Sequence, residues 1–189
     1  MLKLYCHADE TGQDAIASFF LVSIMVSDKG KVEKLGDKLL EMESKTKGKS
    51  KWVNAKDDKK VTFIHELAKI KELKQDLFYS VYKGGGIYTP LVALAVGKAI
   101  IYKVKNIKNY SVNIIIDGLN KVDKEVVRKE LKSLNIKYRK IKTNLKDEQD
   151  VFLRLVDAMA GFIRDYLEKE KYAVELFKEH NLTRFFMQI

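Results

Sequence analysis

The spacing of apolar residues predicts five β-strands along the chain. The opening segment Leu2–Ala8 alternates apolar and polar residues with the two-residue period of a strand, and it ends at the turn-forming sequence Asp9–Gly12. Val112–Ile116 is a short, continuous apolar run that stops at Asp117, which is typical of a strand buried on both faces. The remaining strands are predicted at Ala17–Val26, Leu77–Tyr82 and Ile136–Lys142.

Apolar residues that recur every three or four positions predict helices between and after these strands. Thr89 and Pro90 form a helix start, because a hydroxyl side chain caps the first turn and proline fits the first helical position. The lysine-rich segment Ser44–Lys60 is expected to be a loop, and Leu182–Ile189 is expected to be a tail. The predicted helices are Val32–Glu43, Val61–Leu73, Thr89–Val104, Val122–Leu134, Glu148–Leu167 and Tyr172–His180.

The order of these elements predicts one α/β domain over residues 1–189. Strands that alternate with helices form a sheet whose two faces are both covered by helices. The helices between the second and third strands interrupt this alternation, so residues 31–73 are interpreted as a helical, lysine-rich insertion within the domain.

The composition indicates a globular protein of a reducing compartment. The chain is 46% hydrophobic and 33% charged, which provides enough apolar material for a core. Its single cysteine, Cys6, excludes a disulfide framework and a thiolate-rich metal centre. The opening residues lack the pattern of a secretory leader, and no apolar run matches the roughly 20 residues that span a bilayer. We expect a cytoplasmic protein with no membrane partner, and the sequence leaves open whether it forms a homo-oligomer.

The net charge points toward a polyanionic partner. The chain has 36 basic and 26 acidic residues, for a formal charge of +10, and only five of the basic residues are arginine. A phosphate backbone is the commonest partner of a basic domain. A bias toward lysine also arises from adaptation to heat, so the charge alone does not decide for nucleic acid.

Two aspartates follow predicted strands and are candidates for a shared site. Asp9 follows the first strand, and Asp117 follows the fourth. If these strands are parallel neighbours, both carboxylates lie at the edge where α/β sheets collect ligands. Close carboxylates repel each other, which favours a shared proton or a divalent cation. The alternative for each aspartate alone is a turn former or a helix cap.

A third aspartate lies on the long predicted helix near the C-terminus. Positions 150, 154, 157 and 161 form one narrow stripe, while the other positions between Val151 and Ile163 are apolar. The helix is therefore expected to be buried almost all round, with Asp157 close to the core. The structural alternative for Asp157 is an ordinary ion pair with Arg154 on the same helix. Gly161, one turn later, is expected to let another element approach closely. Three such carboxylates suit Mg²⁺ or Mn²⁺, and two such ions can promote phosphodiester hydrolysis.

These residues and the element order resemble the ribonuclease H superfamily. More narrowly, the chain is similar to a widespread prokaryotic family of uncharacterised ribonuclease H-like proteins, which has an Asp-Glu-Ser-Gly motif after the first strand and a Gln-Leu-Ala-Asp motif in the last helix. The motifs here read Asp9-Glu10-Thr11-Gly12, Ile116-Asp117-Gly118 and Arg154-Leu155-Val156-Asp157. The resemblance implies a mixed five-stranded sheet and metal ligation by the three aspartates. Arg154 departs from the motif, and its charge would either neutralise Asp157 or grip a phosphate.

Further residues are candidates for supporting roles. Glu10 lies on the opposite strand face from Asp9 and is either an auxiliary catalytic residue or a turn residue. Asp150 is either a fourth metal ligand or the partner of Arg154 one turn later. In the lysine-rich segment, Lys49, Lys51 and Trp52 would hold phosphates and stack on a base, or would form a solvated loop held by one aromatic residue.

The function that the sequence predicts is metal-dependent hydrolysis of RNA or DNA. Asp9, Asp117 and Asp157 would be the ligands of Mg²⁺ or Mn²⁺, with Glu10 and Asp150 as auxiliary residues. One alternative is a catalytically silent ribonuclease H-like module that binds nucleic acid. The other is a protein-interaction module whose charge serves only its solubility.

Overall fold

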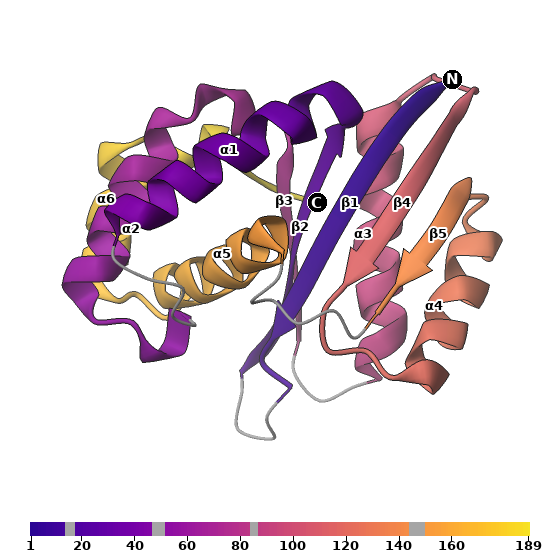
Figure 1. Cartoon of the computed structure of the whole chain (residues 1–189). Coiled ribbons are helices and arrows are strands. Elements are labelled where there is room, and N and C mark those ends of the chain that lie inside the picture. The colour runs from indigo at the N-terminus through magenta and orange to yellow at the C-terminus, as the bar shows by residue number, and fades with distance from the viewer. Residues whose placement is uncertain (14–17, 47–51, 84–86, 144–149) are drawn as a thin grey trace.

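A computed structural model shows a mixed β-sheet with helices on both faces (Figure 1). It describes residues 1–13, 18–46, 52–83, 87–143 and 150–189. Within these residues the strands form one six-stranded sheet in the order β5-β4-β1-β2-β3-β6. Strands β1, β2 and β3 pair antiparallel, whereas β4 pairs parallel to β1, β5 to β4 and β6 to β3. The strands are β1 (Leu2–Thr11), β2 (Phe19–Asp28), β3 (Leu77–Lys83), β4 (Tyr110–Ile116), β5 (Tyr138–Lys142) and β6 (Phe186–Gln188).

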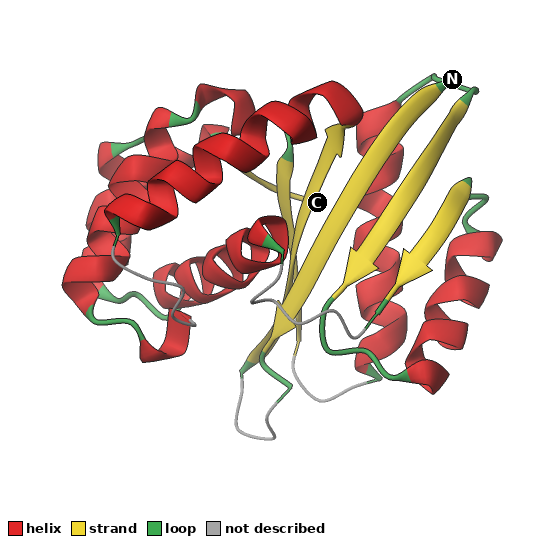
Figure 2. Ribbon diagram, viewed as in Figure 1, coloured by secondary structure: helices red, strands yellow, loops and turns green. Residues whose placement is uncertain are grey.

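The two faces of the sheet carry separate hydrophobic cores, and the helices divide between them (Figure 2). Helices α3 (Tyr88–Val104) and α4 (Lys121–Ser133) cover one face. The other face is covered by α1 (Lys29–Lys45), α2 (Asp57–Lys69), α5 (Val151–Leu167) and α6 (Lys171–Glu179). Short 3-10 turns lie at Trp52–Asn54 (η1), Lys71–Leu73 (η2) and Leu182–Arg184 (η4).

The predicted fold class is confirmed, with one strand more than expected. The segment predicted as a tail contains β6, which pairs with β3 through Leu77 and Phe186. Phe186 is buried in the core on the α5 side of the sheet. A strand of three residues is too short to show a period in the sequence, so only its packing and pairing reveal it.

The described residues of the lysine-rich segment, 44–46 and 52–60, include helical structure where a loop was expected. They contain η1, and α2 begins at Asp57 rather than at Val61. Asp57 and Asp58 lie in the first turn of α2, where negative charge is favourable next to the helix dipole. The early start of the helix therefore has an electrostatic reason that apolar periodicity does not show.

Helix α5 is buried almost all round, as its sequence predicts. Its apolar side chains from Phe152 to Ile163 are buried, whereas Arg154, Asp157 and Gly161 are partly exposed along one stripe. The helix packs across β1 and β2 and contacts α1, α6 and η1. It therefore carries Asp157 to the face of the sheet next to β1. Among the described residues, no helix is long and apolar enough to cross a bilayer.

Candidate active site

Strands β1 and β4 bring Asp9 and Asp117 to the same edge of the sheet. The two strands are parallel and pair Ala8 with Ile116, and the backbone N–H of Asp117 donates to the carbonyl of Ala8 at 3.1 Å. Ala8 and Ile116 are buried in the core on the α3 side. Because side chains alternate along a strand, Asp9 faces the opposite layer, which contains α5. The condition set by the sequence, that the two strands are parallel neighbours, is met.

Asp157 reaches this edge from α5 and is contacted by η1. The backbone N–H of Trp52 donates to Asp157 Oδ2 at 3.4 Å. One turn later, a Cβ placed on Gly161 would lie 2.0 Å from Trp52 Cδ1, which is far inside contact distance. The prediction that Gly161 admits another element is therefore confirmed, and that element is η1. The close approach at Gly161 places the Trp52 backbone beside the carboxylate.

The pKa of Asp9 depends on the charges of the other acidic residues that the sequence singled out. Burial raises the pKa of Asp9 well above its ordinary value, and the charges of Glu10, Asp157 and Asp117 raise it further, in that order of size. A hydrogen bond from the Glu10 backbone to Asp9 Oδ1, at 2.9 Å, acts in the opposite direction. A carboxylate in such a place is unfavourable unless a positive charge or a proton compensates it.

Glu10 belongs to the same acidic group, and Asp117 is the neighbouring charge with the largest effect on it. Burial and then the charge of Asp117 raise the pKa of Glu10 to about 7. Its Oε1 accepts a hydrogen bond from Gln13 at 3.0 Å, whereas its buried Oε2 has no hydrogen-bond partner among the described residues. Gly118, with a positive φ of 72°, would place a Cβ 3.5 Å from Glu10 Oε1, so the turn after β4 passes close to this carboxylate.

A cavity of about 390 Å³ opens beside these carboxylates, between β1, η1, α2 and α5. Its lining combines acids with two cations, Lys60 and Arg164. Arg164 pairs with Glu168 at 2.9 Å and lies 3.5 Å from the Thr11 hydroxyl. The lining residues are Glu10, Thr11, Trp52, Val53, Lys60, Asp157, Ala160, Gly161, Arg164, Asp165 and Glu168.

A network around Asp165 fixes the wall of this cavity. Asp165 Oδ2 accepts hydrogen bonds from the Trp52 indole at 3.0 Å, from the Lys60 ammonium at 3.2 Å and from the Tyr172 hydroxyl. Burial and the hydrogen bond to Asp165 raise the pKa of Tyr172, so its hydroxyl remains a donor. The sequence prediction missed this network. Extending the polar stripe of α5 by one turn reaches Arg164 and Asp165, and this was the available signal.

Asp150 has the contacts of a helix cap, which differ from the predicted fourth metal ligand. Its Oδ1 accepts the backbone N–H groups of Phe152 and Leu153 at 2.9 and 3.3 Å, and its Oδ2 lies 3.6 Å from His7 Nε2. Burial acts to raise the pKa of Asp150, but the His7 contact and the two backbone N–H groups together lower it. The side chain thus stabilises the start of α5.

The predicted nucleic-acid contacts are corrected in part. Trp52 is only 6% exposed and packs against Phe63 and Phe162, so its indole is not available to stack on a base. Arg154 forms a two-pronged ion pair with Glu43 of α1, at 2.6 and 2.8 Å, and this partner was not predicted from the sequence. Lys49 and Lys51 lie outside the described residues.

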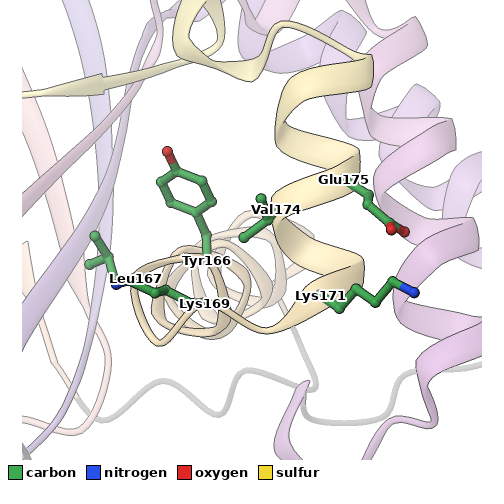
Figure 3. A pocket seen from close by; sticks show the side chains of 6 residues that line it. All are labelled: Tyr166, Leu167, Lys169, Lys171, Val174 and Glu175. Carbon is green, nitrogen blue, oxygen red and sulfur yellow. The ribbon is translucent and has the colours of Figure 1, made fainter.

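A second hollow, of about 700 Å³, lies between the end of α5 and α6 (Figure 3). It is lined mainly by the apolar parts of Tyr166, Leu167 and Val174, with Lys169, Lys171 and Glu175 around them. Glu175 is the one carboxylate in this lining, so this hollow does not offer the cation site that the acidic group does.

Comparison with solved structures identifies the class of fold. No protein-family model and no curated protein matches the sequence. Among solved structures, ribonuclease HII from Archaeoglobus fulgidus, seen in a complex with PCNA, is 12% identical with a TM-score of 0.53, and the match covers 95% of this chain and 78% of that one. Ribonuclease H2 from Pyrococcus horikoshii OT3 is 16% identical with a TM-score of 0.55, with 90% and 77% covered. The chain therefore has a ribonuclease H-like fold, and its narrower resemblance to the prokaryotic family stays a prediction.

Proposed function

We propose that this protein hydrolyses phosphodiester bonds of RNA or DNA with the help of Mg²⁺ or Mn²⁺. The observation that carries the proposal is the convergence of Asp9, Asp117 and Asp157 from β1, the end of β4 and α5 at one edge of the sheet. The likeness to two ribonucleases supports the same conclusion at the level of the fold.

The residues present fit a hard divalent cation. All of the donors are carboxylate oxygens, which are the ligands that Mg²⁺ and Mn²⁺ prefer. The group is half-buried, its charges repel one another, and the buried Oε2 of Glu10 has no hydrogen-bond partner within the described part of the chain. Asp9, Asp117 and Asp157 would hold the ion, with Glu10 beside them. When bound, such an ion polarises the phosphate and promotes attack by water.

The protein's own residues orient the site and attract the substrate. The Trp52 backbone N–H contacts one oxygen of Asp157 and thereby restricts its carboxylate. Lys60 and Arg164 line the same cavity, but each already pairs with a carboxylate, Asp165 and Glu168 respectively, so the repulsion between the acidic group and a phosphate is left for the metal ion to compensate. The net charge of +10 supports a polyanionic substrate on the scale of the whole surface.

The test compares Asp117→Asn with the wild type by calorimetry and by cleavage of labelled RNA and DNA. Asn keeps the shape of Asp117 and removes one charge from a repulsive group, so the variant should have a higher melting temperature in EDTA. Added Mn²⁺ should stabilise the wild type by about 2.7 kcal/mol at a hundredfold excess over the dissociation constant. The variant should lose that stabilisation together with cleavage, while the exposed Asp37→Asn on α1 should retain both.

If the protein is instead a silent binding module, the same experiments should give the opposite results. In that case a positive charge already compensates the acidic group, the wild type shows no response to Mn²⁺, and Asp117→Asn destabilises the protein by breaking a buried pair. That pair of results, with nucleic acid still bound, would overturn the nuclease proposal. Failure to bind nucleic acid at physiological salt would instead favour a protein-interaction module.

A further inference from the structure

Two of the three histidines in the sequence meet in space far from each other along the chain. His65 lies on α2, and His180 follows the last residue of α6. His65 Nδ1 and His180 Nε2 are 2.7 Å apart, and the ring centroids are 4.8 Å apart with the planes nearly perpendicular. The two nitrogens therefore point toward each other from two different helices.

A carboxylate completes this cluster. Glu179 Oε1 lies 3.8 Å from His65 Nδ1 and 3.7 Å from His180 Nε2, almost equally far from both nitrogens. The three donor atoms lie within 4.8 Å of one another. His180 is mostly buried and His65 is about one third exposed, while Glu179 is open to solvent. The two imidazoles are therefore the less exposed members of the cluster, and the cluster is open to solvent on the Glu179 side.

We propose that His65, Glu179 and His180 form a binding site for a divalent transition-metal ion of the zinc class. Two imidazoles and one carboxylate are a known ligand set for zinc, with the fourth position left to water. Imidazole nitrogen selects Zn²⁺ over Mg²⁺, so this ion differs in kind from the one proposed for the carboxylate group. The proposal does not rest on the proposed hydrolase activity.

To hold the ion, the donor atoms have to shift slightly and the two imidazole rings have to turn so that both nitrogen lone pairs face the ion and not each other. Ligand distances of 2.0–2.2 Å in a tetrahedral site separate the donor atoms by about 3.3 Å. The two nitrogens would have to move apart by about half an ångström, and the Glu179 oxygen would move inward by about as much. Glu179 and His65 have the exposure that permits such movement. Without metal, the 2.7 Å contact requires that one nitrogen donates and the other accepts.

A metal ion at this place would clip α2 to α6. Both helices also contact Asp165 on α5, through Lys60 of α2 and Tyr172 of α6. The expected consequence is stability of the helical layer, because an ion that binds only the folded state shifts the unfolding equilibrium.

The test uses Zn²⁺ on the full chain in excess Mg²⁺, which occupies oxygen sites. Long-range ¹H–¹⁵N spectra resolve the three imidazoles, and the buried His7 serves as the internal control. One equivalent of Zn²⁺ should shift the signals of His65 Nδ1 and His180 Nε2 and leave His7 unchanged. At a hundredfold excess over the dissociation constant, the melting temperature should rise by about 5–10 °C.

Variants separate this site from adventitious binding. His65→Ala and His180→Ala should abolish the Zn²⁺-dependent rise in melting temperature, and Glu179→Gln should reduce it. Glu175→Gln, on the same helix and exposed, is the matched control and should respond like the wild type. Unshifted His65 and His180 signals in the wild type would overturn the proposal, and so would a Zn²⁺ response that survives both histidine variants.

Discussion

At the scale of single residues, the same residue type serves different purposes according to what surrounds it. Asp9 is half-buried among other acids, and desolvation followed by their charges raises its pKa. Asp150 also lies at the end of an element, but two backbone N–H groups and His7 face it, so its pKa is lowered. The surroundings of Asp9 disfavour its ionised form unless a cation binds there, whereas the surroundings of Asp150 stabilise its ionised form.

A prediction at this scale concerns Asp150. Asp150→Ala should lower the free energy of unfolding at pH 7 by about 1 kcal/mol, because the first turn of α5 loses its cap. Asp150→Asn retains the cap and loses only the charge that faces His7, so it should cost less. Urea unfolding of the three proteins measures the difference.

The pH dependence of the same variants has a definite sign. Because the pKa of Asp150 is lower in the folded state, its ionised form contributes stability above the unfolded pKa, which is about 3.9. That contribution is lost as the pH falls through the lower folded value. The gap between wild type and Asp150→Asn should therefore narrow between pH 5 and pH 3, and a gap that widens in acid would contradict the assignment.

At the scale of elements, the contact between α5 and η1 brings Trp52 to the candidate site. Gly161 leaves room for the Trp52 ring, and the Trp52 backbone then contacts Asp157 one turn earlier on α5. The indole also donates to Asp165 one turn later. One close approach between two elements therefore sets the position of a proposed metal ligand and of the cavity wall.

Gly161→Ala tests this contact. The new Cβ would lie 2.0 Å from Trp52 Cδ1 and 2.8 Å from Trp52 Cβ, so the whole residue would have to move. We expect a loss of about 1–3 kcal/mol from overpacking. Gly36→Ala on α1 is the control, because its Cβ would be 3.8 Å from the nearest atom and it should gain up to about 1 kcal/mol of helix propensity.

Fluorescence provides a second measurement on the same pair of variants. Trp52 is the single tryptophan of the chain, so the emission of the folded protein reports on its burial. Gly161→Ala should shift the emission to the red, whereas Gly36→Ala should leave it unchanged. An unchanged spectrum and unchanged stability in Gly161→Ala would show that η1 does not pack on α5 as described.

At the scale of the whole molecule, the sheet separates two layers with different tasks. Helices α3 and α4 close one face with an apolar core, while the opposite layer holds α1, α2, α6 and α5, which carries Asp157. The chain as a whole has a formal net charge of +10, although this site is acidic. A net positive charge attracts a polyanion over a distance. The repulsion between the acidic group and the polyanion has to be compensated within the site itself.

Salt dependence tests the surface charge. If the protein binds single-stranded nucleic acid through phosphates, log affinity should fall linearly with log salt, with a slope of about −0.7 for each phosphate contacted. Replacing Lys49 and Lys51 together with alanine should make the slope shallower. Lys129→Ala with Lys132→Ala on α4 is the matched control. If the variant of Lys49 and Lys51 has the same slope as the wild type, that segment is not part of the binding surface.

The sequence by itself determined the local elements and the three aspartates. Apolar spacing reports directly which face of a strand or helix is buried, so β1, β4 and α5 were predictable, with Asp117 directly after β4 and Asp157 on α5. The predicted end of the first strand was too early, because β1 continues through Asp9 to Thr11 where a turn was expected. The narrow polar stripe of α5 also predicted that Gly161 admits a neighbour, because a buried helix with one glycine on a polar stripe leaves space there.

Only the tertiary structure decided which distant residues meet. The pairing of β6 with β3, the ion pair of Arg154 with Glu43, the burial of Trp52 and the contact of His65 with His180 all join segments that are far apart in the chain. Periodicity contains no information about such partners, since each side of a contact looks like an ordinary exposed or apolar residue until the helices pack. The packing of the insertion and the C-terminal helices on α5 therefore determined these contacts, and the local pattern could not.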